Sequence, residues 1–127
     1  MAKILIVDDD VDLVDACRRI LEKAGHEVSQ GYNVAEGKKA IEQFKPDLLI
    51  LDVMMEQQDD GIRMAQDLRR THFKTPILML TSIGRVTGLG FDKSSDLVPV
   101  DAFQEKPVSP AKLLSLVDSL LKQAKGG

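Results

Sequence analysis

The sequence predicts an α/β fold in which a parallel sheet carries helices on both faces. Short aliphatic runs, typical of strands buried on both sides, alternate with stretches whose apolar residues recur every three or four positions. The connections between these stretches are short, and the resulting βαβαβαβ pattern is typical of a doubly wound parallel sheet. Acidic residues directly follow two of the aliphatic runs.

Length and composition indicate one domain over residues 1–127, with a polar tail at 122–127. The net charge of −3 does not favour nucleic-acid binding, which requires a basic face. No stretch has the length of a membrane span or the pattern of a signal peptide, so we expect a cytoplasmic protein. Cys17 is the single cysteine, which excludes an internal disulfide and predicts a small buried side chain.

The first half of the chain is predicted to contain strands at 3–7, 27–32 and 48–52, separated by two helices. The strand at 27–32 is weakly apolar, so we expect it at an edge of the sheet. The apolar face of the first helix consists of Leu13, Val14, Cys17, Ile20, Leu21 and Ala24, with Gly25 as the helix stop. The second helix has Asn33 as its cap, Lys45-Pro46 as its end, and Val34, Ala40, Ile41 and Phe44 on its apolar face.

In the second half, a polar turn at 56–61 is predicted to precede a helix that ends with Arg69 and Arg70. The inward residues of that helix are Ile62, Met64, Ala65 and Leu68. A strand at 76–80 follows. Residues 83–100 contain Gly, Ser and Pro where the repeat calls for a helix, and each interior Gly costs a helix about 1 kcal/mol, so a loop or a short frayed helix is expected there. A strand at 101–105 then leads to a final helix with Ser109 as its cap and Pro110 at its first position.

Polar residues fall at the carboxyl ends of four predicted strands, which meet at one edge of a parallel sheet. They are Asp8 and Asp9, Asp52, Thr81 and Lys106. Clustered carboxylates repel one another unless a cation is bound, and Mg²⁺ prefers such oxygen ligands. A lysine and a hydroxyl suit the oxygens of a phosphoryl group. We therefore interpret Asp52 as a nucleophile that forms an acyl phosphate.

Each of these residues taken alone has a more ordinary interpretation. A lone Asp at a strand end is usually a helix cap or a solvated acid, Thr81 alone is a turn or cap residue, and Lys106 alone is a surface charge. Their joint arrival at successive strand ends favours a site. Four further polar residues are assigned to no site: Asp10, Asp12, His26 and His72.

Four motifs together resemble the receiver domain of two-component response regulators, over essentially the entire chain. They are KILIVDDD at 3–10, PDLLILDVMM at 46–55, LTS at 80–82 and FQEKP at 103–107. The resemblance implies a stand-alone receiver with a flavodoxin-like, doubly wound, five-stranded parallel sheet in the order 2-1-3-4-5.

The resemblance also implies roles for individual residues around Mg²⁺. Asp52 is the residue phosphorylated by a partner histidine kinase. Asp9, Asp52 and the main-chain carbonyl of Met54 hold the ion, and Asp8 acts through a bound water.

Three more residues gain roles from the resemblance. Thr81 is the switch hydroxyl, Phe103 is the switch aromatic, and Lys106 is the phosphate-binding lysine, followed by a cis bond to Pro107. Phosphorylation would draw Thr81 inward, with Phe103 following into the space released, and would change the preference of one face for its partners.

The implied function is that of a switch and not of a turnover enzyme, apart from Mg²⁺-dependent self-phosphorylation by small donors and autodephosphorylation. The expected partners are a sensor histidine kinase or phosphotransfer protein and an unknown downstream protein, with neither nucleic acid nor membrane. The expected state is a monomer or a phosphorylation-dependent dimer.

Two departures from the family pattern stand out. Glu56 replaces a customary Pro, and Asp59-Asp60-Gly61 stretches a customary Asp-Gly pair by one residue, so the loop after Asp52 differs. Residues 83–100 replace a regular fourth helix with a Gly-containing stretch.

Two other functions are compatible with the sequence. A small Mg²⁺-dependent phosphatase of the haloacid-dehalogenase type would use Asp8 as its nucleophile, because Asp8 and Asp10 have the Asp-x-Asp spacing after a first strand. A pseudo-receiver would bind its partners without phosphorylation.

Overall fold

Five parallel strands form one sheet in the order β2-β1-β3-β4-β5. The computed structural model describes residues 2–52, 60–71, 73–82, 101–106 and 109–126. The strands are β1 Lys3–Val7, β2 Glu27–Gly31, β3 Leu48–Asp52, β4 Ile77–Ser82 and β5 Ala102–Lys106. The helices are α1 Val11–Lys23, α2 Val34–Phe44, α3 Asp60–Arg70 and α4 Pro110–Gly126. The parallel α/β fold is confirmed, with β2 at an edge as predicted.

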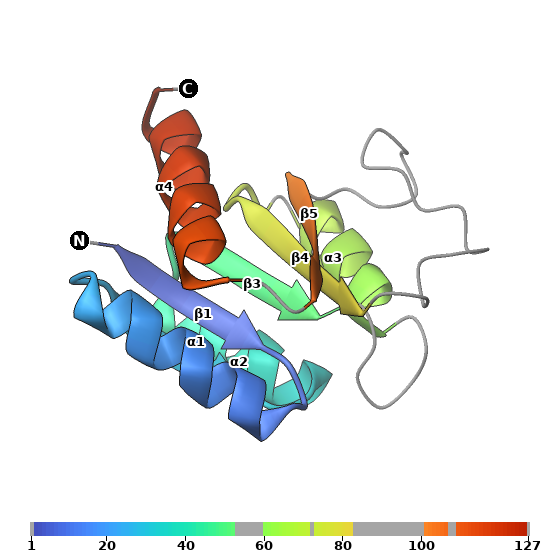
Figure 1. Ribbon diagram of the computed structural model, residues 1–127. Helices are drawn as coiled ribbons and strands as arrows, with labels where there is room; N and C mark the ends of the chain where they lie inside the picture. Colours follow the sequence, from blue (N-terminus) through green and yellow to red (C-terminus); the bar gives the residue numbers. More distant parts are fainter. Residues whose placement is uncertain (1, 53–59, 72, 83–100, 107–108, 127) are drawn as a thin grey trace.

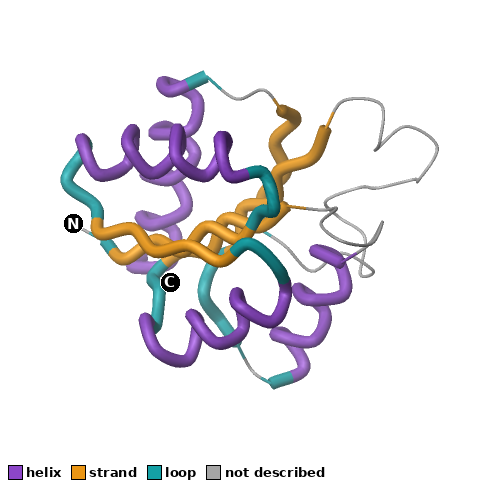
Figure 2. The backbone as a smooth tube through the Cα atoms, turned by 90° about the horizontal axis from the view of Figure 1, so that it is seen from below, coloured by secondary structure: helices purple, strands orange, loops and turns teal. Residues whose placement is uncertain are grey.

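The strands β1, β3 and β4 are buried on both faces because each divides its side chains between two helical layers, as the two-residue period of a strand dictates. Ile4, Ile6 and Ile50 pack with α1 and α4, while Leu5 and Leu49 pack with α2 and α3. Figure 2 shows the helices on both sides of the strands. Burying one such aliphatic side chain contributes about 1.5–3 kcal/mol, so the continuous apolar runs supply much of the stability.

The predicted caps Asn33 and Ser109 are confirmed, and Asp10, predicted in the first turn of the first helix, is the cap of α1. The side chains of Asp10, Asn33 and Ser109 accept hydrogen bonds from main-chain N–H groups in the first turns of α1, α2 and α4. Gly25, just after α1, has a φ of 98°, and Lys45, the C-cap of α2, has a φ of 52°. Both chain reversals therefore use the left-handed conformation that ends many helices.

Several predicted boundaries are wrong. The third helix begins at Asp60, so Asp60 and Gly61 belong to α3 and not to the preceding turn. The last helix continues to Gly126 through most of the segment predicted as a polar tail at 122–127, because Lys, Gln and Ala are good helix formers. Ala24, predicted on the apolar face of the first helix, is exposed at its C-cap. The prediction for 83–100 lies outside the described residues.

The strands run in one direction, so their carboxyl ends lie along one edge of the sheet. In Figure 1 the arrowheads of β1, β3 and β4 point to the same edge, which we call the carboxyl edge. The opposite edge, where the strands begin, is the amino edge. Across the described residues, every helix is too short or too polar to span a bilayer.

Candidate functional site

Two acidic residues become neighbours at the carboxyl edge because β1 pairs with β3. The register aligns Val7 with Leu51, so the next residue of each chain segment is an aspartate. Asp52 is the last residue of β3, and Asp8 follows β1 directly. Both are almost fully buried, with relative exposures of 1% for Asp8 and 5% for Asp52.

Asp8 is fixed by main-chain groups on both sides. Its N–H donates to the carbonyl oxygen of Gly31 in β2 at 3.1 Å. Its Oδ1 accepts from the N–H of Asp10 at 2.9 Å. The loop between β1 and α1 is therefore tied both to the neighbouring strand and to its own helix cap.

Gly31 also lets α2 approach this edge closely. A Cβ atom at Gly31 would lie 2.8 Å from the main-chain nitrogen of Gly37 in α2. A Cβ at Gly37 would lie 2.9 Å from both methyl carbons of Val7, the residue before Asp8. Any side chain at either glycine would push the helix away from the strand ends that carry the acids.

Three carboxylates form a cluster at this edge. One carboxylate oxygen from each of Asp8, Asp9 and Asp52 lies within 4.8 Å of the other two. Asp9 is exposed, while the other two are buried, so the cluster opens to solvent on one side. Like charges this close, two of them out of water, favour a bound cation.

The oxygen donors suit a hard divalent ion. Mg²⁺ binds oxygen ligands at 2.0–2.1 Å, so ligands on opposite sides of one octahedral ion are about 4.2 Å apart. Side chains spaced within 4.8 Å need only small adjustments to meet that geometry. The prediction that these three acids lie together at one edge of the sheet is confirmed.

The structure places the backbones of three other predicted residues. Thr81 lies near the end of β4, and β5 contains Phe103 and ends at Lys106. The register pairs Ser82 with Lys106, so Thr81 and Lys106 lie at the carboxyl edge, whereas Phe103 is the second residue of β5 and pairs with Met79. Met54 and Glu56 lie outside the described residues.

The residues assigned to no site behave accordingly where they are described. Asp10 is the N-cap of α1, and Asp12 lies in its first turn. Cys17 is buried in the core as predicted. His26 lies near the amino edge, where its Nδ1 accepts from the N–H of Ala2 at 3.2 Å. Burial lowers the pKa of His26, and the positive amino terminus lowers it further.

Sequence reasoning missed three residues that organise the sheet. Gly31 was counted only as part of a weak strand, although its carbonyl holds Asp8. Arg69 and Asp101 were interpreted as a helix-end charge and a strand residue, but they bind each other across 32 residues of sequence. No local sequence pattern signals such a distant pair.

Comparison with known proteins points to one family. Residues 4–118 match the family model described as "Response regulator receiver domain". The chain is 36% identical over 123 residues to the alkaline phosphatase synthesis transcriptional regulatory protein PhoP of Bacillus subtilis. It is 35% identical over 127 residues to the DNA-binding dual master transcriptional regulator RpaA of Synechocystis. These alignments cover 96% and 97% of this chain but 49% and 50% of the relatives, so the chain spans about half their length.

Solved structures agree. A CheY-like response regulator receiver domain protein from Methanospirillum hungatei has a TM-score of 0.81 at 27% identity, with 99% of this chain and 98% of that chain covered. A putative response regulator from Chloroflexus aurantiacus has a TM-score of 0.79 at 30% identity, with 95% and 98% covered.

Proposed function

The chain belongs to the response regulator receiver domain family, and from this premise we propose that it is a switch phosphorylated on Asp52. The observation that carries the proposal is the cluster at the carboxyl edge. Asp52 ends a fully buried strand and lies with Asp8 and Asp9 where a cation and a phosphoryl group can meet. The donor would be the phosphohistidine of a sensor histidine kinase or a phosphotransfer protein in the cytoplasm.

In the proposed step, a carboxylate oxygen of Asp52 attacks the phosphorus of the donor. A P–O bond forms, the P–N bond of the phosphohistidine breaks, and the leaving imidazole takes a proton from solvent. Bound Mg²⁺ would neutralise charge on the phosphoryl oxygens. Asp9, Asp52 and the carbonyl of Met54 would hold the ion, with Asp8 acting through a water.

Two other residues would bind the oxygens of the phosphoryl group on Asp52. Thr81 would donate a hydrogen bond to one phosphoryl oxygen, and Lys106 would pair with another. The ends of β4 and β5 at the carboxyl edge support these roles. The resulting pull on Thr81 would move Phe103 and change the surface that a downstream protein binds, in a monomer or a phosphorylation-dependent dimer.

The chain would act as a single receiver domain without turnover chemistry of its own beyond self-phosphorylation and autodephosphorylation. The names of PhoP and RpaA describe transcriptional regulators about twice as long as the part matched here. DNA binding is therefore not part of the proposal for residues 1–127. The phosphatase alternative that uses Asp8 has no support from the family match.

Incubation with acetyl phosphate and Mg²⁺, followed by intact-mass measurement, tests the proposal. We expect one phosphoryl adduct on the wild type and none on Asp52→Asn or after chelation of the metal. An unmodified wild type would favour the pseudo-receiver alternative. An undiminished adduct on Asp52→Asn would rule out Asp52 as the acceptor.

A further inference from the structure

The start of β5 is held by a set of hydrogen bonds among Arg69, Asp101 and Ile77, which we call the joint. These bonds belong to neither the acid cluster nor the apolar core. β5 lies at the end of the strand order and pairs with β4. At its start, Asp101 faces Ile77, the first residue of β4. Arg69, near the end of α3, reaches the same point.

Asp101 makes two bonds to one residue. Its N–H donates to the carbonyl oxygen of Ile77 at 3.0 Å, and its Oδ2 accepts from the N–H of Ile77 at 2.8 Å. Both polar main-chain groups of Ile77 are thus bonded to the same residue of the neighbouring segment.

Arg69 supports this arrangement from the side. Its Nη2 donates to the same Oδ2 of Asp101 at 2.9 Å, and its Nη1 donates to the carbonyl oxygens of Phe73 and Thr75 at 2.7 and 2.9 Å. One planar guanidinium therefore joins the end of α3, the approach to β4 and the start of β5, a geometry that lysine cannot reproduce. The Arg69 side chain is 24% exposed and the Asp101 side chain 40%, so the ion pair is open to solvent, whereas the bonds from Arg69 to Phe73 and Thr75 are partly buried.

This joint selects one register of β5 on β4. Ile77 is fully buried, and a buried N–H without an acceptor is costly. A slip of one residue would bring Val100 or Ala102 opposite Ile77, and neither side chain has a polar atom. Of these three registers, the one with Asp101 opposite Ile77 gives the N–H of Ile77 a side-chain acceptor.

Register matters because Lys106 ends the same strand. The ladder that begins next to Asp101 pairs Leu78 with Ala102 and ends with Ser82 paired with Lys106. A slip of one residue would turn every side chain of the strand to the opposite face. We infer that Arg69 and Asp101 are positioning residues that hold β5 in the register that presents Lys106 to the phosphoryl group on Asp52. The inference rests on the proposed function.

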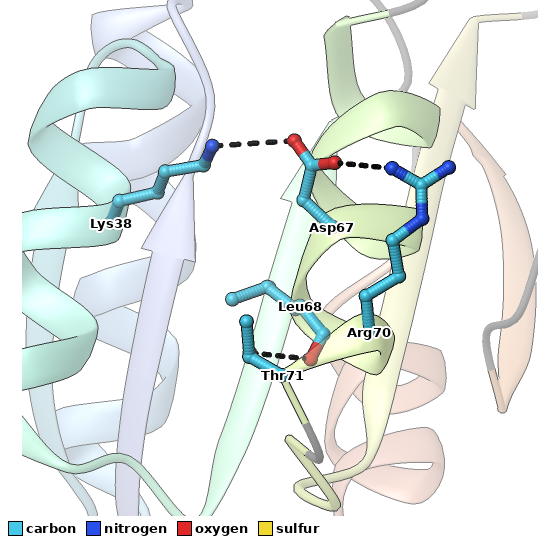
Figure 3. Close-up of polar contacts among 5 residues, drawn as sticks. All are labelled: Lys38, Asp67, Leu68, Arg70 and Thr71. Carbon is cyan, nitrogen blue, oxygen red and sulfur yellow. Dashed lines mark hydrogen bonds and ion pairs between the residues drawn. The ribbon is translucent and has the colours of Figure 1, made fainter.

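A matched surface ion pair provides the control. Lys38 of α2 and Asp67 of α3 are 3.3 Å apart, and Asp67 also lies 3.3 Å from Arg70 (Figure 3). This pair joins two helices and contacts no residue of β4 or β5 through the bonds drawn. Exposed pairs of this kind contribute little to stability.

The test compares Asp101→Ala, Asp101→Asn and Asp67→Ala with the wild type. Three quantities are measured: the phosphorylation rate with acetyl phosphate at saturating Mg²⁺, the Mg²⁺ dissociation constant, and amide hydrogen exchange at 102–106. We expect Asp101→Ala to slow phosphorylation about tenfold, equivalent to about 1.4 kcal/mol, with faster exchange in β5 and unchanged Mg²⁺ affinity. Asp101→Asn keeps an acceptor for Ile77 and should fall between Asp101→Ala and the wild type, while Asp67→Ala should match the wild type.

A double variant tests whether the effect of Asp101 on phosphorylation depends on Lys106. If Asp101 acts through Lys106, Asp101→Ala slows phosphorylation no further in a Lys106→Ala background. An equal loss of phosphorylation rate in both backgrounds would overturn the inference. A wild-type rate in Asp101→Ala would overturn it too. So would a simultaneous loss of Mg²⁺ affinity in Asp101→Ala, which would indicate that the whole fold is loosened. A wild type that takes no phosphoryl group would overturn the proposed function as well, whereas a phosphorylated wild type with an unaffected Asp101→Ala overturns this inference alone.

Discussion

The two edges of the sheet use acidic residues in opposite ways. At the amino edge, isolated acids accept hydrogen bonds: Asp47 accepts from the N–H of Lys3 at 2.9 Å, and Asp101 accepts from the N–H of Ile77 and from Arg69. At the carboxyl edge, three carboxylates lie together, two of them buried. The hydrogen bonds at the amino edge join neighbouring strands, whereas the carboxylates at the carboxyl edge repel one another unless a cation is bound.

This difference separates acids that would bind the cation from acids that hold the strands of the same sheet in place. Paired acids at the amino edge should matter for folding whether or not a ligand is present. Clustered acids at the carboxyl edge should stabilise the fold only when a cation is bound, because a ligand that binds the native state shifts the folding equilibrium. Three tests follow, in decreasing order of expected effect.

The largest effect is expected at the carboxyl edge. A Mg²⁺ concentration of 100 times the dissociation constant should raise the free energy of unfolding of the wild type by about 2.7 kcal/mol. Asp9→Asn removes one of the three carboxylates and should lose most of this gain. Urea unfolding with and without MgCl₂ measures it.

Asp12→Asn is the matched control, because Asp12 lies in the first turn of α1 outside the cluster. It should keep the full gain from Mg²⁺. Equal gains in Asp9→Asn and Asp12→Asn would contradict a cation site at the cluster.

A smaller effect is expected at the amino edge. Asp47→Ala removes the acceptor of the Lys3 N–H and should lower the free energy of unfolding by roughly 1 kcal/mol. The loss should be the same with and without Mg²⁺, and phosphorylation should proceed at the wild-type rate. A slower phosphorylation reaction at unchanged stability would contradict a purely structural role for Asp47.

The smallest effect is a pH dependence at His26. Burial, followed by the positive amino terminus, lowers its pKa from 6.5, although Asp118 opposes the shift. The unfolded chain then binds a proton at a higher pH than the folded chain does, so stability should decrease as the pH falls from 6.5 toward the lowered pKa and then level off. Protonation would also convert the Nδ1 that accepts from Ala2 into a donor. Urea unfolding across this range should show the decrease in the wild type and its loss in His26→Gln; identical profiles would contradict it.

Prediction from sequence succeeded where the signals were local. The aliphatic runs, Asn33 and Ser109 as caps, and the acids after the strands all follow from neighbouring residues. Because parallel strands align their ends, these local signals sufficed to bring Asp8, Asp9 and Asp52 together.

The hydrogen bonds at the amino edge join residues that are far apart in the sequence. Asp47 and Lys3 are 44 residues apart, and Arg69 and Asp101 are 32 apart. Such bonds depend on register and on helix placement, which no short pattern encodes. The sequence was therefore more informative about the site than about the bonds that hold its scaffold.

Chemical trapping can identify the residue at the carboxyl edge that accepts the phosphoryl group, which we propose is Asp52. Borohydride reduces an aspartyl phosphate to homoserine and leaves a free aspartate unchanged. Peptide mapping after phosphorylation and reduction should therefore find homoserine at position 52 and aspartate at positions 8 and 9. Homoserine at position 8 or 9, or aspartate at all three positions after a phosphoryl adduct has been observed, would contradict phosphorylation of Asp52.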